Sequence, residues 1–194
     1  MIVGSWAVFA FLLGAVPVGP ILARYLADVA LQSEGSRNTG ATNVARVVGW
    51  KAGAVTLLAD ILKGAVGAGG ALWLSGSGDA AWLCGVLAVL GHCYTPYLHW
   101  RGGKGVATSL GVLVVTATPV ALSTWGVWFA TVALTRRSSV GALCALPTVV
   151  GLTAWWATDQ VGWAMLLAVV VLVRHRDNIT RLLSGTEHGL ERPT

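Results

Sequence analysis

Glycines and basic residues gather in one short polar stretch, HWRGGKGVAT (99–108), which lies between two long apolar segments. Gly102 and Gly103 precede Lys104 in this stretch, and small residues let backbone N–H groups approach an anion closely. A helix that begins just after the loop would point its positive end at the same place, and the Lys104 ammonium adds a full charge. The G-x-x-x-x-G-K-[ST] spacing of a nucleotide-binding P-loop is missing. The stretch therefore predicts a phosphate-binding loop of another kind.

A second polar stretch, EGSRNTGATNVAR (34–46), combines hydroxyl and amide side chains with a guanidinium group. Hydroxyl and amide groups donate hydrogen bonds to phosphate oxygens, and the planar guanidinium of Arg46 suits a phosphate. We expect this stretch to form a second part of an anion-binding site. Its candidate residues besides Arg46 are Ser36, Asn38, Thr42 and Asn43.

Two further stretches, TRRSSVGAL (135–143) and RHRDNITRLLSGTE (174–187), contribute the serine pair Ser138 and Ser139 together with His175 and Asn178. His175 and Asn178 stand three positions apart, so on a continuing helix they share a face. An exposed histidine at a helix end is the competing interpretation. No His, Asp and Glu cluster has the spacing of metal ligands, so no metal site is expected.

The chain that must position these groups has the composition of a membrane protein. Its 194 residues are 55% hydrophobic and only 11% charged, with a mean hydropathy of +0.71, whereas soluble domains carry about 25% charged residues. Because a helix satisfies its own backbone polar groups in a bilayer, we expect an all-α integral membrane protein with a single domain over residues 1–194. About seven transmembrane helices, some of them short, are predicted at 2–24, 52–74, 81–98, 106–118, 119–135, 140–157 and 160–174.

The segment 106–118 is too short for a full span, which needs about 20 residues. A half-length or re-entrant helix, supported by the surrounding protein, is expected there. If this helix turned back to the side from which it enters, the number of spans would fall by one or two.

The basic residues predict the orientation. With seven spans, the loops on one side carry Asp79 and Asp159 but no Lys or Arg, and nearly all basic residues fall on the other side. By the positive-inside rule that other side is cytoplasmic, with the N-terminus outside and the C-terminus inside. The net charge of +5 follows from this topology and requires no nucleic-acid partner. The basic residues on the predicted cytoplasmic side are Arg24, Arg37, Arg46, Lys51, Arg101, Lys104, Arg136, Arg137, Arg174, Arg176, Arg181 and Arg192.

The remaining basic residue, Lys63, lies three positions after Asp60 inside the apolar segment 52–74. Charged side chains within a span are expensive and normally face the interior of a helix bundle. A structural ion pair and a role in the functional site both remain open for these two residues.

Together, the polar stretches make the whole chain resemble the bacterial acyl-phosphate:glycerol-3-phosphate acyltransferase family. The resemblance rests on GSRNTGATNVAR, DILKG, GHCYTP, RGGKGVAT, RRSSVGAL and RHRDNITRLLSGTE. It implies a multi-pass enzyme of the bacterial inner membrane, with seven helices and a cytoplasmic active site. It also implies transfer of a fatty acyl group from acyl phosphate to the sn-1 hydroxyl of glycerol 3-phosphate, which gives lysophosphatidic acid without a cofactor. The implied partners are these two substrates and membrane lipids.

The resemblance also implies residue roles. The implied catalytic residues are Ser36, Arg46, Lys104, His175 and Asn178. The implied substrate-binding residues are Asn38, Thr42, Asn43, Gly102, Gly103, Ser138 and Ser139. Three positions depart from the pattern of the family, namely Arg37 for a glycine, Arg101 for a lysine and Ala15 for a serine. Arg37 adds positive charge beside the expected phosphate site, and none of the three departures removes a group with an implied role.

Acyl phosphate is a mixed anhydride and is already activated, so no covalent acyl-enzyme is required. The sequence agrees, because it contains neither a G-x-S-x-G nucleophile elbow nor an H-x-x-x-x-D dyad. Positioning and charge neutralisation remain as the expected means of catalysis. The attacking hydroxyl could pass its proton to a substrate phosphate oxygen or to His175. We expect Glu34, Asp177 and Glu187 to lie out of reach.

Two other functions are weighed against this one. A small transporter or channel for an anionic metabolite would explain the intramembrane charges, but no clear inverted repeat supports it. A lipid-binding scaffold without catalytic activity would explain the basic side, but not the clustered Asn, Ser and Gly residues. The sequence leaves the acyl-chain preference and the oligomeric state open.

Overall fold

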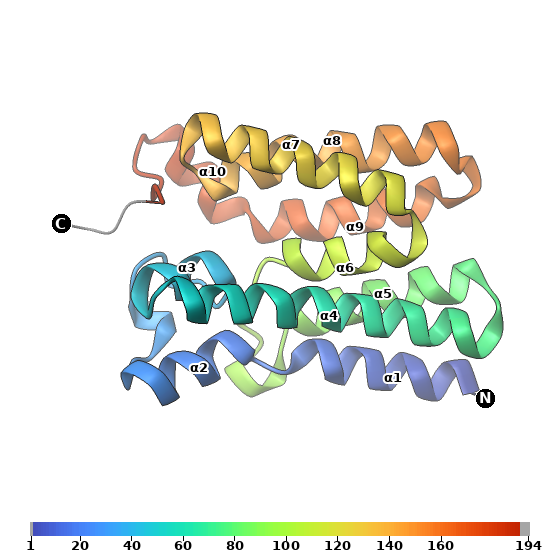
Figure 1. Cartoon of the computed structure of the whole chain (residues 1–194), viewed down its shortest axis with the longest axis horizontal. Helices are drawn as coiled ribbons and strands as arrows, with labels where there is room; N and C mark the ends of the chain where they lie inside the picture. Colours follow the sequence, from blue (N-terminus) through green and yellow to red (C-terminus); the bar gives the residue numbers. More distant parts are fainter. Residues whose placement is uncertain (1, 191–194) are drawn as a thin grey trace.

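The computed structural model describes residues 2–190, and within this range every regular element is a helix (Figure 1). Each of the seven apolar segments contains a helix, so the all-α prediction is confirmed for this part of the chain. The long helices lie side by side along the long axis of the molecule. In chain order the elements are α1 (Ile2–Ala15), α2 (Val18–Ala27), η1 (Leu31–Ser33), α3 (Ala41–Val47), α4 (Trp50–Ser75), α5 (Gly78–Cys93), η2 (Pro96–Leu98), α6 (Val106–Thr116), α7 (Thr118–Thr135), α8 (Ser138–Trp156), η3 (Thr158–Gln160), α9 (Val161–Arg174) and α10 (Arg176–Leu183).

Four helical stretches are long and apolar enough to cross a membrane. They are Ile2–Ala27, Trp50–Ser75, Gly78–Leu98 and Ser138–Trp156. The chain is therefore a multi-pass membrane protein. The number of seven spans and the orientation of the bundle in the membrane stay predictions.

The first predicted segment is not one continuous helix. It is interrupted at Val16 and Pro17, because proline has no N–H group to donate and its ring disfavours a helical residue before it. The break exposes carbonyl groups that other elements satisfy. Thr95 Oγ1 donates a hydrogen bond of 2.6 Å to the Ala15 carbonyl, and the Lys63 ammonium donates to the carbonyl of Val16.

Helix α6 is as short as predicted, since its 11 residues extend only about 16 Å. It begins part-way along the bundle and runs toward the end at which α1 begins, where α7 takes the chain back (Figure 1). Glycines bring α6 and α4 into backbone contact, because a Cβ atom at Gly64 would lie 2.0 Å from the Thr108 carbonyl oxygen and one at Gly111 would lie 1.9 Å from that of Ile61. The short helix is thus buried in protein rather than exposed.

The two ends of the bundle differ in charge. Asp79 in the first turn of α5 and Asp159 in η3 lie at the end where α1 begins. Arg24 in the last turn of α2 and Arg136 between α7 and α8 lie at the opposite end of the bundle, the end that also carries α10. Arg192 falls outside the described residues. This separation of charge is what the predicted orientation requires.

Candidate active site

A single cavity of about 180 Å³ is lined by the ten side chains that the sequence analysis singled out. The cavity lies between α3, α4, α6, α7, α8 and α9, and the chain after α10 also borders it. The ten side chains are those of Ser36, Asn38, Thr42, Asn43, Arg46, Lys104, Ser138, Ser139, His175 and Asn178. Of these ten, Ser36 and Asn178 are 142 positions apart in the chain and still reach the same space.

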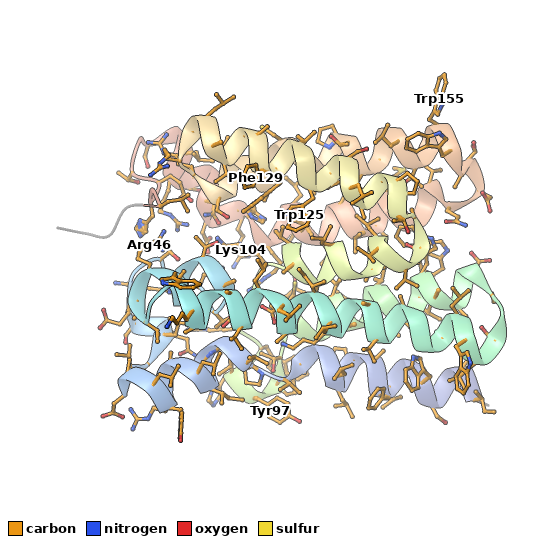
Figure 2. The ribbon with its side chains drawn as sticks, in the orientation of Figure 1. Arg46, Tyr97, Lys104, Trp125, Phe129 and Trp155 are labelled. Atoms are coloured by element: carbon orange, nitrogen blue, oxygen red, sulfur yellow. The ribbon has the colours of Figure 1, made fainter. Side chains whose placement is uncertain are left out.

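The lining of this cavity is polar at one part and apolar at another. Apolar side chains from four helices line this cavity together with the polar ones, among them Leu57 of α4, Leu113 of α6, Trp125 of α7 and Leu146 of α8. Figure 2 shows Lys104 between the two groups, with Arg46 toward the end of the bundle and Trp125 toward its middle. The cavity can thus accept a ligand that has an anionic end and a hydrocarbon end.

Asn43 organises the stretch 34–46 and holds Arg46. Its Oδ1 atom accepts hydrogen bonds from the Ser36 N–H group at 2.9 Å and from Arg46 Nη1 at 3.0 Å. Its Nδ2 atom donates to the carbonyls of Asn38 at 2.9 Å and Glu34 at 3.0 Å. All four hydrogen-bonding positions of the amide are used in this way, so Asn43 positions Arg46 and has no polar atom left for a substrate.

Arg46 supplies a cation to the cavity. Burial lowers the pKa of its guanidinium, and the carboxylate of Glu187 partly opposes that shift. The Nη2 atom also donates a hydrogen bond of 2.7 Å to the Gly189 carbonyl. An arginine stays charged at neutral pH even when its pKa is lowered, so Arg46 carries a permanent positive charge into the site.

The glycine loop positions Lys104 differently from the prediction. The Gly102 N–H group donates to the Cys93 carbonyl at 3.1 Å and the Gly103 N–H group donates to the His92 carbonyl at 3.0 Å. These bonds satisfy carbonyls at the end of α5, which have no partner within their own helix. The expectation that Gly102 and Gly103 offer free N–H groups to an anion is therefore wrong, and neither residue lines the cavity.

Lys104 itself lines the cavity, and so does the start of α6, from Gly105 to Ala107. Gly105 has a φ of +83°, a conformation that glycine adopts without strain. Burial lowers the pKa of Lys104 to about 8, although the nearby Glu187 carboxylate opposes this shift. The positive end of α6 and the Lys104 ammonium thus both face the cavity, as predicted.

His175 and Asn178 come from the junction of α9 and α10 and are both 2% exposed. His175 Nδ1 lies 2.8 Å from the Val171 carbonyl oxygen, so Nδ1 carries the proton and Nε2 is left as an acceptor. Burial lowers the pKa of His175 to about 4, against the effect of this hydrogen bond, and Lys104 lowers it further. The imidazole is therefore neutral at pH 7, and the interpretation of His175 as an exposed surface residue is wrong.

The Oδ1 atom of Asn178 is buried and has no hydrogen-bond partner within residues 2–190. Its Nδ2 atom must be the one that faces Glu187, because a carboxylate can only accept. An unpaired acceptor at the wall of a cavity suits a hydroxyl donor of a ligand.

Glu187 belongs to the site, contrary to the expectation that it lies out of reach. Its Oε1 atom accepts hydrogen bonds of 2.6 Å from Ser139 Oγ and from Asn178 Nδ2, and its Oε2 atom accepts one of 2.8 Å from Arg181 Nε. Burial alone would raise the pKa of Glu187, but these hydrogen bonds outweigh it and lower the pKa. The carboxylate is thus ionised at neutral pH.

The chain after α10 brings Glu187 into place by folding back over the cavity. The Leu190 N–H group donates a hydrogen bond of 2.9 Å to the Arg136 carbonyl, and Gly189 accepts the hydrogen bond from Arg46. The spacing of residues in the sequence does not predict that the chain folds back over the cavity. The one feature that points to Glu187 is its place in the polar stretch RHRDNITRLLSGTE.

The hydroxyl groups of α3 and α8 also meet at the cavity. Thr42 Oγ1 donates to Ser138 Oγ at 3.3 Å, which joins the two helices across the polar part of the site. Within residues 2–190, no group of three or more His, Cys, Asp and Glu side chains is placed to hold a metal ion. The site thus offers cations, hydroxyl groups and amides as its means of binding.

Comparison with known proteins agrees with these features. The family model described as glycerol-3-phosphate acyltransferase matches residues 4–185. A glycerol-3-phosphate acyltransferase of Thermosynechococcus vestitus is 41% identical over 98% of this chain and 96% of its own length. One of Myxococcus xanthus is 44% identical over 91% of this chain and 94% of its own length.

Two crystal structures of PlsY (YgiH), an integral membrane glycerol 3-phosphate acyltransferase, have a similar fold. The glycerol 3-phosphate form superposes with a TM-score of 0.91 and 34% identity, covering 97% of this chain and 96% of that one. The lysophosphatidic acid form gives a TM-score of 0.88 and 33% identity, covering 97% and 95%. Each comparison covers nearly the whole length of both proteins. The chain therefore belongs to the glycerol-3-phosphate acyltransferase family.

Proposed function

We propose that this protein transfers a fatty acyl group from acyl phosphate to the sn-1 hydroxyl of glycerol 3-phosphate, giving lysophosphatidic acid and inorganic phosphate. The observation that carries the proposal is the cavity, where Arg46 and Lys104 border a polar part that continues into an apolar part. Both substrates bear phosphate, and one of them bears a hydrocarbon chain. The relatives named glycerol-3-phosphate acyltransferase, and the related structures with glycerol 3-phosphate and lysophosphatidic acid, support the same acceptor and product.

Two phosphate groups must approach each other in this reaction, and the repulsion between their negative charges opposes that approach. Arg46 and Lys104 offset that repulsion with two fixed positive charges, which the start of α6 reinforces. Ser36, the serine pair and Asn178 orient the oxygens of glycerol and phosphate. The unpaired Oδ1 atom of Asn178 accepts a glycerol hydroxyl in this scheme.

The acyl group moves in one displacement. The glycerol oxygen forms a bond to the acyl carbonyl carbon, the bond between that carbon and the phosphate oxygen breaks, and inorganic phosphate leaves. Of the two possible proton acceptors, a substrate phosphate oxygen is favoured over His175. A phosphate monoester has a second pKa near 6, so it is a stronger base than an imidazole whose pKa is about 4. His175 instead orients the attacking hydroxyl through its Nε2 atom.

The protein lies in the bacterial inner membrane with seven spans, its N-terminus outside and the cavity open to the cytoplasm. The basic end of the bundle, which carries Arg24 and Arg136, supports this orientation. Glycerol 3-phosphate then enters from the aqueous side that the basic end of the bundle faces, and the acyl product leaves toward the lipid.

The test is a reaction with purified protein reconstituted in vesicles, radiolabelled glycerol 3-phosphate and, in parallel, acyl phosphate, acyl-CoA and acyl-carrier protein. We expect label to become lipid-extractable as lysophosphatidic acid with acyl phosphate, at a rate at least tenfold above that with either other donor. Equal rates with acyl-CoA would refute the proposed donor. Uptake of chemically unchanged label, without lipid product, would instead identify a transporter.

A further inference from the structure

Three ionisable side chains form a buried cluster beside the cavity. Lys63 Nζ lies 2.8 Å from Asp60 Oδ1, and His92 Nδ1 lies 3.4 Å from the same oxygen. Asp60 is 2% exposed and Lys63 is 5% exposed, and both lie on α4. The ammonium of Lys63 also donates to the Val16 carbonyl that the break in the first helix leaves free. The cluster therefore ties three helical segments together.

A purely structural role does not account for the whole cluster. Buried ion pairs contribute little net stability, because the loss of hydration roughly cancels their attraction. The pair of Asp60 and Lys63 would be complete without a third ionisable group. The side chains of Asp60 and His92 also line the cavity itself, whereas Lys63 does not.

His92 connects this cluster to the glycine loop. Its carbonyl accepts the Gly103 N–H group at 3.0 Å, so the backbone of His92 already holds the loop. Its imidazole ring packs against the same residue, because a Cβ atom at Gly103 would lie 2.0 Å from His92 Nε2 and 2.7 Å from Cε1. The residue that follows Gly103 is Lys104. The ring therefore supports the backbone from which the Lys104 side chain extends.

Arg174 also holds the loop, because its Nε and Nη2 atoms donate to the carbonyls of Gly103 at 3.0 Å and Gly102 at 2.9 Å. The carbonyls of the loop thus accept hydrogen bonds from Arg174, while its Gly103 residue packs against the imidazole of His92. These contacts restrict the loop and, with it, the direction from which Lys104 approaches the cavity.

We propose that Asp60 and His92 are positioning residues that act through Lys104: Asp60 orients the imidazole of His92, and that ring sets the Gly103 backbone so that the ammonium reaches the substrate phosphates. This inference rests on the proposed function. It gives Asp60 of α4 and His92 of α5 a role in catalysis that does not require either side chain to touch substrate.

The test is a double-mutant cycle of His92→Asn and Lys104→Ala, with kcat/KM for radiolabelled glycerol 3-phosphate as the readout. Asparagine keeps a polar atom near the position of Nδ1, toward Asp60, and removes Nε2 and Cε1, the atoms that face Gly103. His99→Asn is the matched control, because His99 is exposed and has a φ of +51°, which asparagine tolerates. Thermal unfolding in detergent checks that each variant is folded, and His92→Gln replaces His92→Asn if the latter is not.

We expect His92→Asn to lower kcat/KM about tenfold in the parent protein and less than twofold in the Lys104→Ala background. His99→Asn should change kcat/KM less than twofold in both backgrounds. If His92 had a merely structural role, His92→Asn would lower kcat/KM by the same factor in both backgrounds, and that result would overturn the inference. A folded His92→Asn variant with parental activity would also overturn it. Failure of the proposed function is distinct, because the parent would then form no lysophosphatidic acid, or Lys104→Ala would retain the parent rate.

Discussion

The Glu187 carboxylate lies 2.6 Å from the amide nitrogen of Asn178, nine residues earlier in the chain, and this contact fixes the orientation of the amide. The oxygen of Asn178 is turned away from Glu187 and remains unpaired. Glu187 thereby sets the orientation of a buried amide in the cavity wall, a role that its place in the sequence does not predict.

Glu187→Gln should disrupt this arrangement. The amide would put a donor in place of one carboxylate oxygen, where it meets either the Arg181 donor or the donors of Ser139 and Asn178, and hydrogen bonds to a charged group contribute about 2 kcal/mol each. We expect a lower unfolding temperature and a loss of kcat/KM of at least about tenfold, or ~1.4 kcal/mol. Glu34→Gln, at an exposed position, is the control and should match the parent protein. Parental activity and stability in Glu187→Gln would show that the tail does not order the site.

Lys104→Ala should leave the protein folded and slow the reaction on the order of a hundredfold, because loss of one charge-assisted contact in the transition state costs ~3 kcal/mol. Lys104→Arg should rescue only part of the rate, since a guanidinium is broader than an ammonium. The exposed Lys51→Ala serves as the matched control. A folded Lys104→Ala protein within about threefold of the parent rate, a difference under ~1 kcal/mol, would remove Lys104 from the site.

The pH dependence of kcat/KM should show an alkaline limb near the pKa of Lys104, which burial lowers to about 8. Below that pH the ammonium is charged and binds phosphate, and above it the charge and the activity are lost. Lys104→Arg should lack this limb, because arginine does not titrate in the same range. Measurement of kcat/KM from pH 5 to pH 10 on the parent protein and on Lys104→Arg tests this prediction. If the alkaline limb were unchanged in Lys104→Arg, the titrating group would be one other than Lys104.

Gly102→Ala should destabilise the loop. A Cβ atom there would lie 2.1 Å from the His92 carbonyl oxygen, which is backbone and cannot move aside. We expect a lower unfolding temperature together with reduced activity. Gly126→Ala on α7 is the control, because no atom lies within 4 Å of its added Cβ and alanine favours a helix. Equal unfolding temperatures for the two variants would contradict the close approach at Gly102.

Orientation can be tested with single cysteines and an impermeant thiol reagent on intact cells. The background protein should lack native cysteines, because Cys144 is exposed while Cys84 and Cys93 are buried. Asp159→Cys should be labelled, and Ser184→Cys should react only after the membrane is opened. Labelling of Ser184→Cys in intact cells would place the basic end of the bundle, and the cavity, on the outer side.

The grouping of the ten cavity side chains could be predicted from the sequence, because polar stretches that flank apolar helices collect at the ends of a bundle. This reasoning predicts that Lys104 and Arg46 line a common site. Pro17 predicts the break in the first helix, because proline has no N–H group to donate. The pairing of Gly102 and Gly103 with α5 could not be predicted, since it depends on where α5 ends. The position of Glu187 could not be predicted either, because a short polar tail has no hydrophobic periodicity from which its packing could be inferred.

The short α6 has a consequence for the fate of the acyl donor. Because α6 begins part-way along the bundle, Lys104 lies farther from the basic end than Arg46 does (Figure 2). In the proposed reaction, a donor whose phosphate binds Lys104 would carry its acyl carbonyl to a depth where bulk water is scarce, so water would compete poorly with glycerol as the nucleophile. Hydrolysis of the proposed acyl phosphate donor to free fatty acid would thereby be suppressed, and the activated chain would be conserved for the lipid product.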